Sequence, residues 1–193
     1  QVGGGSGVVE MRNNVLVAAN GVYITANGAI TGTGELSLGF LGLQNSGTLG
    51  PGIQVHRGLA PAGAAQAPAA VATMTITGKL TMSPSGRLAI PLIGKNAGQY
   101  GSLAVSGATV LDGVLALDFQ QGYAPRQGDR FTFLDGAGAV TGAFDSVAIS
   151  GLAPGFQYEL TNSGGELTLR ALNNGIPTSD QPWRVFLPLA RRR

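Results

Sequence analysis

Apolar residues occupy every second position through most of residues 73–119, and glycines interrupt the pattern at short intervals. The apolar positions in this alternation are Met74, Ile76, Leu80, Met82, Leu88, Ile90, Leu92, Leu103, Val105, Leu111, Leu115, Leu117 and Phe119. A period of two places one face of each strand in a core and the other face in solvent. Because no helical periodicity separates these segments, the pattern predicts an all-β protein made of many short strands.

Two short motifs recur inside this alternating region. The tripeptide at 76–78, ITG, returns as VSG at 105–107, which is 29 residues later, and GRLAI at 86–90 returns as GVLAL at 113–117, which is 27 residues later. A spacing of this size is typical of one turn of a β-solenoid, in which glycines at the corners allow close backbone approach. The predicted fold class is therefore a parallel β-helix (β-solenoid), and a β-sandwich with strands of the same period is the alternative.

The rest of the sequence predicts how this body is bounded. Residues 1–172 are expected to form the β-solenoid body, with a C-terminal hairpin over 159–169 that caps it. A segment within about 53–72 is rich in alanine and proline and lacks alternation, so it is predicted to be a loop excursion. Residues 173–193 are expected to form a polar linker, an apolar C-terminal strand and an arginine tail.

Near the N-terminus the pattern predicts four further strands, one of them a short strand over 22–25. Residues 8–12 and 15–19 are expected to be two separate strands. A strand over 35–43 is expected to place Leu36, Leu38 and Phe40 on one face.

The charge distribution excludes some partners. Arg191, Arg192 and Arg193 supply three of the 12 basic residues, so residues 1–190 hold nine basic against ten acidic residues. No basic stripe with interleaved aromatic residues is present, and nucleic acid is not an expected partner. Charged residues make up 11% of the chain against about 25% in an average protein, which leaves a weakly charged surface that suits a subunit of an assembly. No apolar run approaches the roughly 20 residues that span a membrane.

Two stretches resemble a known family. Residues 46–52 read SGTLGPG and residues 75–82 read TITGKLTM, which resembles the GTLxPG…LTITGxLTL text of secreted bacterial β-helix proteins such as autotransporter passengers and large surface adhesins. The continuation over 103–115 and the GDRFTFL at 128–134 are also similar, and in that family this text closes the helical passenger. The resemblance covers roughly residues 30–170. It implies a right-handed parallel β-helix, export and a role at the cell surface. The alanine-proline segment and the lack of an outer-membrane barrel depart from the family, so autotransport itself is not implied.

No catalytic site is predicted. His56 is the single histidine and has no acidic neighbour in sequence, so a Ser-His-Asp triad is not expected. Asp112 and Asp118 fall on the same outward face, and paired carboxylates can serve glycoside hydrolysis, but aspartates beside glycine are more typical of turns. The chain has no cysteine, no phosphate-binding loop and no calcium-binding nonapeptide, so no cofactor or metal is expected.

The apolar segment near the C-terminus is the predicted assembly interface. Its residues are Trp183, Val185, Phe186, Leu187 and Leu189, a set too short to span a membrane and too apolar to remain in water. Two hypotheses for this segment stay open. The segment either caps its own body as an edge strand, which Pro188 favours, or is donated to the next subunit.

The function predicted from the sequence is that of an extracellular structural protein rather than an enzyme. Copies of the chain would join head to tail in a filament, sheath or surface layer, held by β contacts between subunits. The alternative is a monomeric surface adhesin or carbohydrate-binding passenger fragment, with cell-surface polysaccharide as its partner. Gln1 fits a mature end left by a signal peptidase, so a secreted protein is expected, although trimming of a longer chain would look identical.

Overall fold

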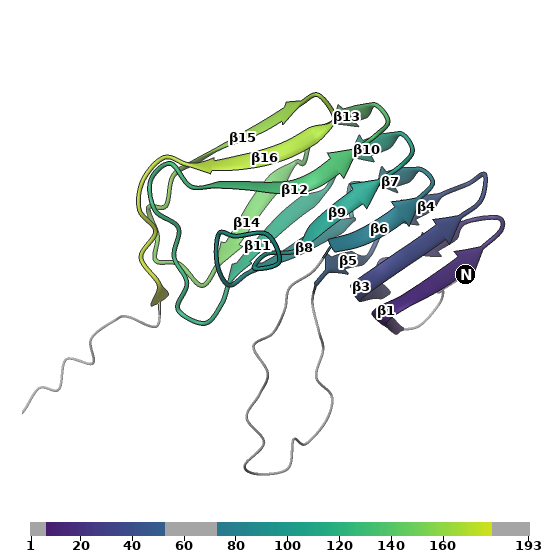
Figure 1. Ribbon diagram of the computed structural model, residues 1–193, viewed down its shortest axis with the longest axis horizontal. Helices are drawn as coiled ribbons and strands as arrows, with labels where there is room; N and C mark the ends of the chain where they lie inside the picture. Colours follow the sequence, from purple (N-terminus) through teal and green to yellow (C-terminus); the bar gives the residue numbers. More distant parts are fainter. Residues whose placement is uncertain (1–6, 53–72, 179–193) are drawn as a thin grey trace, which may run out of the picture.

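The computed structural model describes residues 7–52 and 73–178, and the regular secondary structure in this part of the chain consists almost entirely of β-strands (Figure 1). The all-β prediction is therefore confirmed. In chain order the strands are β1 (Val8–Ala18), β2 (Val22–Ile24), β3 (Ala29–Leu38), β4 (Leu43–Asn45), β5 (Thr48–Pro51), β6 (Thr73–Thr77), β7 (Leu80–Met82), β8 (Arg87–Leu92), β9 (Ser102–Val105), β10 (Thr109–Leu111), β11 (Val114–Phe119), β12 (Arg130–Gly136), β13 (Val140–Gly142), β14 (Ser146–Ser150), β15 (Tyr158–Ser163) and β16 (Glu166–Ala171). Within the described ranges, no helix has the length and apolar character needed to cross a membrane.

The strands pair according to a simple rule. Each strand from β3 to β11 pairs in parallel with the strand three places further along the chain. The smaller sheet has the order β2-β4-β7-β10-β13, and the larger sheet contains the rows β3-β5-β8-β11-β14 and β3-β6-β9-β12. β3 belongs to both rows because its first half pairs with β5 and its second half with β6. The result is a curled, partly parallel sheet beside a smaller parallel one (Figure 1).

The last two strands of the larger sheet pair antiparallel instead of parallel. β15 and β16 form an antiparallel hairpin, and β16 pairs antiparallel with β12. The turn between them holds Gly164 and Gly165, both with positive φ, a conformation that glycine adopts without strain. The hairpin predicted over 159–169 is therefore confirmed.

The recurring motifs mark residues that lie side by side. Ile76 of β6 is the register partner of Val105 of β9, as the 29-residue recurrence suggests. Leu88 and Ile90 of β8 are the partners of Leu115 and Leu117 of β11. The sequence repeats therefore identify the correct strand pairs and the correct register.

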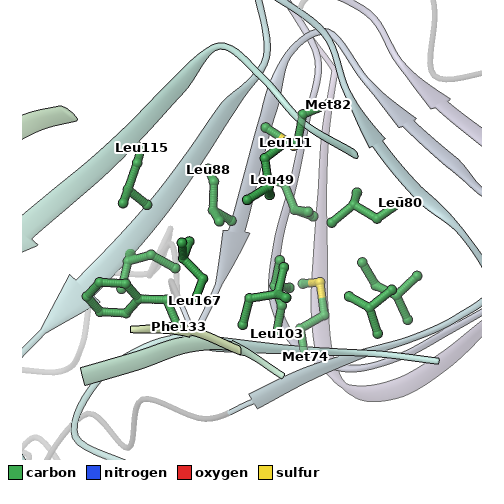
Figure 2. Close-up of a cluster of buried hydrophobic side chains, with 14 of the residues drawn as sticks. Leu49, Met74, Leu80, Met82, Leu88, Leu103, Leu111, Leu115, Phe133 and Leu167 are labelled. Carbon is green, nitrogen blue, oxygen red and sulfur yellow. The ribbon is translucent and has the colours of Figure 1, made fainter. Parts of the chain in front are cut away.

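The core is formed by the inward-facing apolar residues of the alternating strands. Figure 2 shows side chains from three strand rows pointing into one interior: Leu49, Leu88 and Leu115 from one row, Leu80, Met82 and Leu111 from the second, and Met74, Leu103 and Phe133 from the third. Each of these nine side chains is no more than 3% exposed. Burial of this kind contributes about 25 cal/mol per Å² of apolar surface, so the core is the main source of stability.

A column of glycines lies at one corner of the chain. Gly28, Gly47, Gly86 and Gly113 directly precede β3, β5, β8 and β11. The residue after each later glycine donates its N–H to the carbonyl of the glycine before it in the column, as in Arg87 N to Gly47 O at 2.7 Å and Val114 N to Gly86 O at 2.9 Å. A Cβ on Gly113 would lie 2.3 Å from the Gly86 carbonyl oxygen. Glycine is required here because neighbouring segments of backbone touch.

Two strand boundaries differ from the sequence prediction. Residues 8–12 and 15–19 do not form separate strands but one strand, β1, in which the register shifts between Arg12 and Asn14 and Asn13 has a φ of 52°. The predicted strand over 35–43 ends at Leu38, and Phe40 is 84% exposed instead of facing inward. The chain turns at Gly39, where a Cβ would lie 1.5 Å from the Ala19 carbonyl oxygen. Alternation alone does not show this backbone contact.

The glycine column gives a stability prediction. Gly113→Ala and Gly164→Ala both place alanine at a similar positive φ, 71° and 64°, but only Gly113 has backbone atoms close to the new Cβ. We expect Gly164→Ala to lower the free energy of unfolding by about 1–2 kcal/mol through φ strain. Gly113→Ala should cost about 1–3 kcal/mol more through overpacking. Urea denaturation followed by circular dichroism measures both, and equal losses would show that the close approach is not needed.

Candidate functional site

The strands at the two ends of the sheets have an unpaired edge in the described part of the chain. At the first end, β1 pairs only with β3 and β2 only with β4. At the other end, β13 pairs only with β10, β14 only with β11 and β15 only with β16. Figure 1 shows β1 and β15 at opposite ends of the molecule. An unpaired edge presents backbone N–H and C=O groups that can pair with another chain.

The apolar core is incompletely covered at both ends. One row of inward side chains runs through successive register partners from Val9 to Val147: Val9, Ile30, Leu49, Leu88, Leu115 and Val147. The four interior members are 0% exposed, whereas Val9 and Val147 are only partly buried. The same holds for the terminal strands in general, whose partly buried apolar residues are Val9, Leu16, Ala18, Val22, Val140, Val147, Ile149, Tyr158 and Leu160. Both ends therefore leave apolar surface that one more strand layer would cover.

Exposed apolar side chains also gather near the first end. Of the large hydrophobic residues that are exposed in the described ranges, most lie within the first 41 residues: Val8, Val15, Val17, Tyr23, Phe40 and Leu41. Val15 and Val17 of β1 are 61% and 71% exposed. A concentration of this kind on one end is typical of an interaction surface.

The strand directions at the two ends are compatible. β1 runs parallel to β14, because β1, β3, β5, β8, β11 and β14 are joined by parallel pairings. β1 also runs parallel to β15, because the two antiparallel pairings through β16 cancel. A copy placed end to end could therefore continue both rows of the larger sheet in the existing direction.

The backbone of β1 has a defined open side. The Ala18 carbonyl accepts the N–H of Gly39 at 2.9 Å, so the polar groups of Ala18 point toward β3. The N–H and C=O groups of successive residues in a strand point to opposite sides. Those of Val17 and Val15 therefore face the unpaired edge, and those of Leu16 face β3.

Charge does not protect this edge. β1 carries Glu10 and Arg12, and these bind each other, with Arg12 Nε 3.2 Å from Glu10 Oε1. The hydrogen bond that Arg12 donates to the Glu10 carboxylate raises the pKa of Arg12. Natural edge strands often avoid pairing through uncompensated charges, and β1 has none.

The two aspartates singled out from the sequence each have polar partners of their own. Asp112 accepts the N–H of Gly113 at 2.7 Å, and Asp118 accepts the hydroxyl of Ser150 at 2.7 Å. Asp112 thus makes a turn contact beside Gly113, and Asp118 makes a contact with the neighbouring strand β14. His56 and the predicted assembly residues Trp183, Val185, Phe186, Leu187 and Leu189 lie outside the described residues.

A polar pocket, which the sequence did not suggest, lies where two loops meet. The loop 93–101 joins β8 to β9 and the loop 120–129 joins β11 to β12, so the pairing of these strands places the loops side by side. The pocket has a volume of about 450 Å³, and its polar lining residues are Lys95, Gln99, Tyr123, Arg126 and Asp129. We call it the corner pocket. The lining residues of one loop are at least 24 positions from those of the other (99 to 123), and only the strand register brings the two loops together.

Tyr123 is the most perturbed group of the corner pocket. Its ring stacks on Phe119 with centroids 6.3 Å apart and meets Phe131 edge-on at 6.4 Å. Burial, with a smaller contribution from the Asp129 charge, raises the pKa of Tyr123 to about 12. Its hydroxyl is buried and has no hydrogen-bond partner among the described residues.

In the described ranges, no three His, Cys, Asp or Glu side chains come close enough together to hold a metal ion. The sequence matches no protein-family model, and comparison with curated proteins finds no significant similarity.

The raised pKa predicts a pH dependence of stability. Because the folded pKa of Tyr123 lies above its ordinary value of 10, the unfolded chain loses this proton first as the pH rises. The stability that the neutral phenol provides is present below pH 10 and is lost between pH 10 and about 12. We expect the free energy of unfolding to fall more steeply in this window for the unmodified chain than for Tyr123→Phe. Urea denaturation at several pH values measures the difference, and identical slopes would contradict the assignment.

Proposed function

We propose that this protein is a parallel β-solenoid whose copies join end to end in an extracellular filament, sheath or surface layer. The solenoid is supported by the parallel pairing of strands three places apart, from β3 to β14. A β-sandwich of the immunoglobulin type is built from antiparallel strands, and among the named strands of the described chain only the pairings of β16 are antiparallel.

One observation carries the proposed assembly. The row from Val9 to Val147 is fully buried in the middle and partly exposed at both ends. End-to-end contact would place Val9 of one copy against Val147 of the next and would bury both. The unpaired edge of β1 would at the same time meet the unpaired edges of β14 and β15, which run in the same direction.

The symmetry of this contact determines the product. The two ends of the molecule are different surfaces, so the contact is heterologous. A heterologous contact whose rotation does not close a ring repeats without limit and forms a filament. Low overall charge, at 11% charged residues, keeps electrostatic repulsion between copies small.

Export and a cell-surface location belong to the same proposal. They rest on the resemblance of residues 46–52 and 75–82 to secreted bacterial β-helix proteins.

The proposed role of the C-terminal segment rests on its composition. Trp183, Phe186 and Leu187 would act as anchors that reinforce the contact between copies. Aromatic and aliphatic anchors of this kind supply much of the binding energy of protein interfaces.

Electron microscopy and sedimentation of the purified chain test the assembly. Val17→Pro removes an N–H that faces the open edge of β1. It leaves intact the backbone N–H and C=O groups of Leu16 and Ala18, which pair with β3. We expect filaments from the unmodified chain and isolated particles from Val17→Pro, with circular dichroism unchanged. Val17→Thr keeps the N–H and should still form filaments.

A deletion of residues 181–193 in the same experiment tests the C-terminal anchors. Loss of filaments with an unchanged unfolding transition is expected, and intact filaments after the deletion would contradict the role of this segment. Isolated particles from the unmodified chain at all concentrations would contradict assembly itself and favour the monomeric adhesin.

A further inference from the structure

The corner pocket is held in shape by a small set of internal contacts. Asp129 accepts the backbone N–H of Arg126 at 2.8 Å and the Lys95 ammonium at 3.3 Å, and its own N–H donates to the Arg126 carbonyl at 3.0 Å. On the facing loop, Gln99 Oε1 accepts the N–H of Asn96 at 3.2 Å. Each acceptor oxygen of Asp129 and Gln99 therefore already receives one hydrogen bond from within the pocket.

The donors of the corner pocket are not all used. Arg126 lines the pocket, and its guanidinium forms no ion pair with any described residue. The Tyr123 hydroxyl has no partner in the described ranges. Lys95 has three N–H donors, of which the contact with Asp129 uses one. A pocket with spare donors and occupied acceptors is suited to a ligand rich in acceptors.

The residues beside the corner pocket include further positively charged side chains. Arg130 of β12 lies directly opposite Arg170 of β16, although like charges at such positions are unfavourable. Neither arginine forms an ion pair within the described ranges. On the hairpin, Glu159 is the register partner of Arg170. Together with Lys95, Arg126, Asp129 and Asp118, the register partner of Pro91 just before the loop 93–101, this corner has four positive and three negative groups. The net charge of the corner is therefore positive, which favours an anionic ligand over a cationic one.

The size and the apolar part of the lining argue for more than a simple ion. A volume of about 450 Å³ falls in the range of small-molecule sites. Ile93, Ala124 and the ring of Tyr123 add apolar surface beside the donors. A sugar ring combines hydroxyl groups with C–H faces, and a carboxylate is matched by the planar guanidinium of arginine.

From these features we propose that the corner pocket binds an acidic saccharide, a sugar that carries a carboxylate. Arg126 holds the carboxylate, Lys95 and the amide of Gln99 reach the ring hydroxyls, and the Tyr123 ring supports the C–H face. The site does not depend on the proposed end-to-end assembly, because no residue of β1, β13, β14 or β15 lines the pocket.

Equilibrium dialysis with three small probes tests this binding, and it does not require the protein to be monomeric. D-galacturonate carries a carboxylate where D-galactose carries a hydroxymethyl group, and acetate carries the carboxylate without the ring. We expect galacturonate to bind at least about tenfold more tightly than either galactose or acetate, because only galacturonate uses both the arginine and the ring contacts.

Variants identify the residues responsible. Arg126→Gln should weaken galacturonate binding about tenfold or more, and should leave the weak binding of galactose unchanged. Arg87→Gln is the matched control, because Arg87 is an exposed arginine of β8 that does not line the pocket, and this variant should bind as the unmodified chain does.

Three results would overturn the proposal. They are absence of galacturonate binding, equal affinity for galacturonate and acetate, and equal loss of binding in Arg126→Gln and Arg87→Gln. The second result would indicate that only the charge is recognised, and the third that binding is a diffuse effect of net charge. Filament formation by the same sample would be unaffected by any of these outcomes, so the two proposals can fail separately.

Discussion

The structure depends on backbone hydrogen bonding between strands three places apart in the chain. This pairing aligns inward residues such as Leu49, Leu88 and Leu115 in continuous apolar rows. It also imposes the glycine column, because the corners can stack only where no Cβ separates the backbones. Core packing, strand register and corner chemistry are therefore consequences of one repeated contact, and a change at Gly86 or Gly113 affects all three.

A stack built in this way has ends that its own repeat cannot complete. Every interior strand of the row from β3 to β14 has a hydrogen-bonded neighbour on both sides, but β1 and β14 have one on one side alone in the described chain. Proteins that contain such edges usually protect them with charge, proline, a β-bulge or a covering segment. β1 has one irregularity, at Asn13, but beyond it the strand carries exposed valines, and its one ion pair neutralises itself. The proposed assembly turns this unfavourable exposure into the driving force for contact between copies.

The sequence predicted the parts of the fold that the repeat controls, and not those that single backbone contacts control. The recurrence of residues 76–78 at 105–107 identified the register of Ile76 and Val105, because a repeat of this length reflects stacking. Alternation could not show that the chain turns at Gly39 and leaves Phe40 exposed, since the cause is a contact with Ala19. The corner pocket was missed for a similar reason. Lys95 and Asp129 become neighbours only when their loops lie one above the other, and no local pattern encodes that distance.

Hydrogen exchange of individual β1 amides tests the proposed end-to-end contact most directly. The Leu16 N–H pairs with β3 within one molecule and should be protected at every protein concentration. The N–H groups of Val15 and Val17 face the open edge and can be protected only by another chain segment. The account predicts that Val15 and Val17 exchange rapidly in dilute protein and become protected as the concentration rises, while Leu16 does not change. Exchange of Val15 and Val17 at one rate across all concentrations would contradict it.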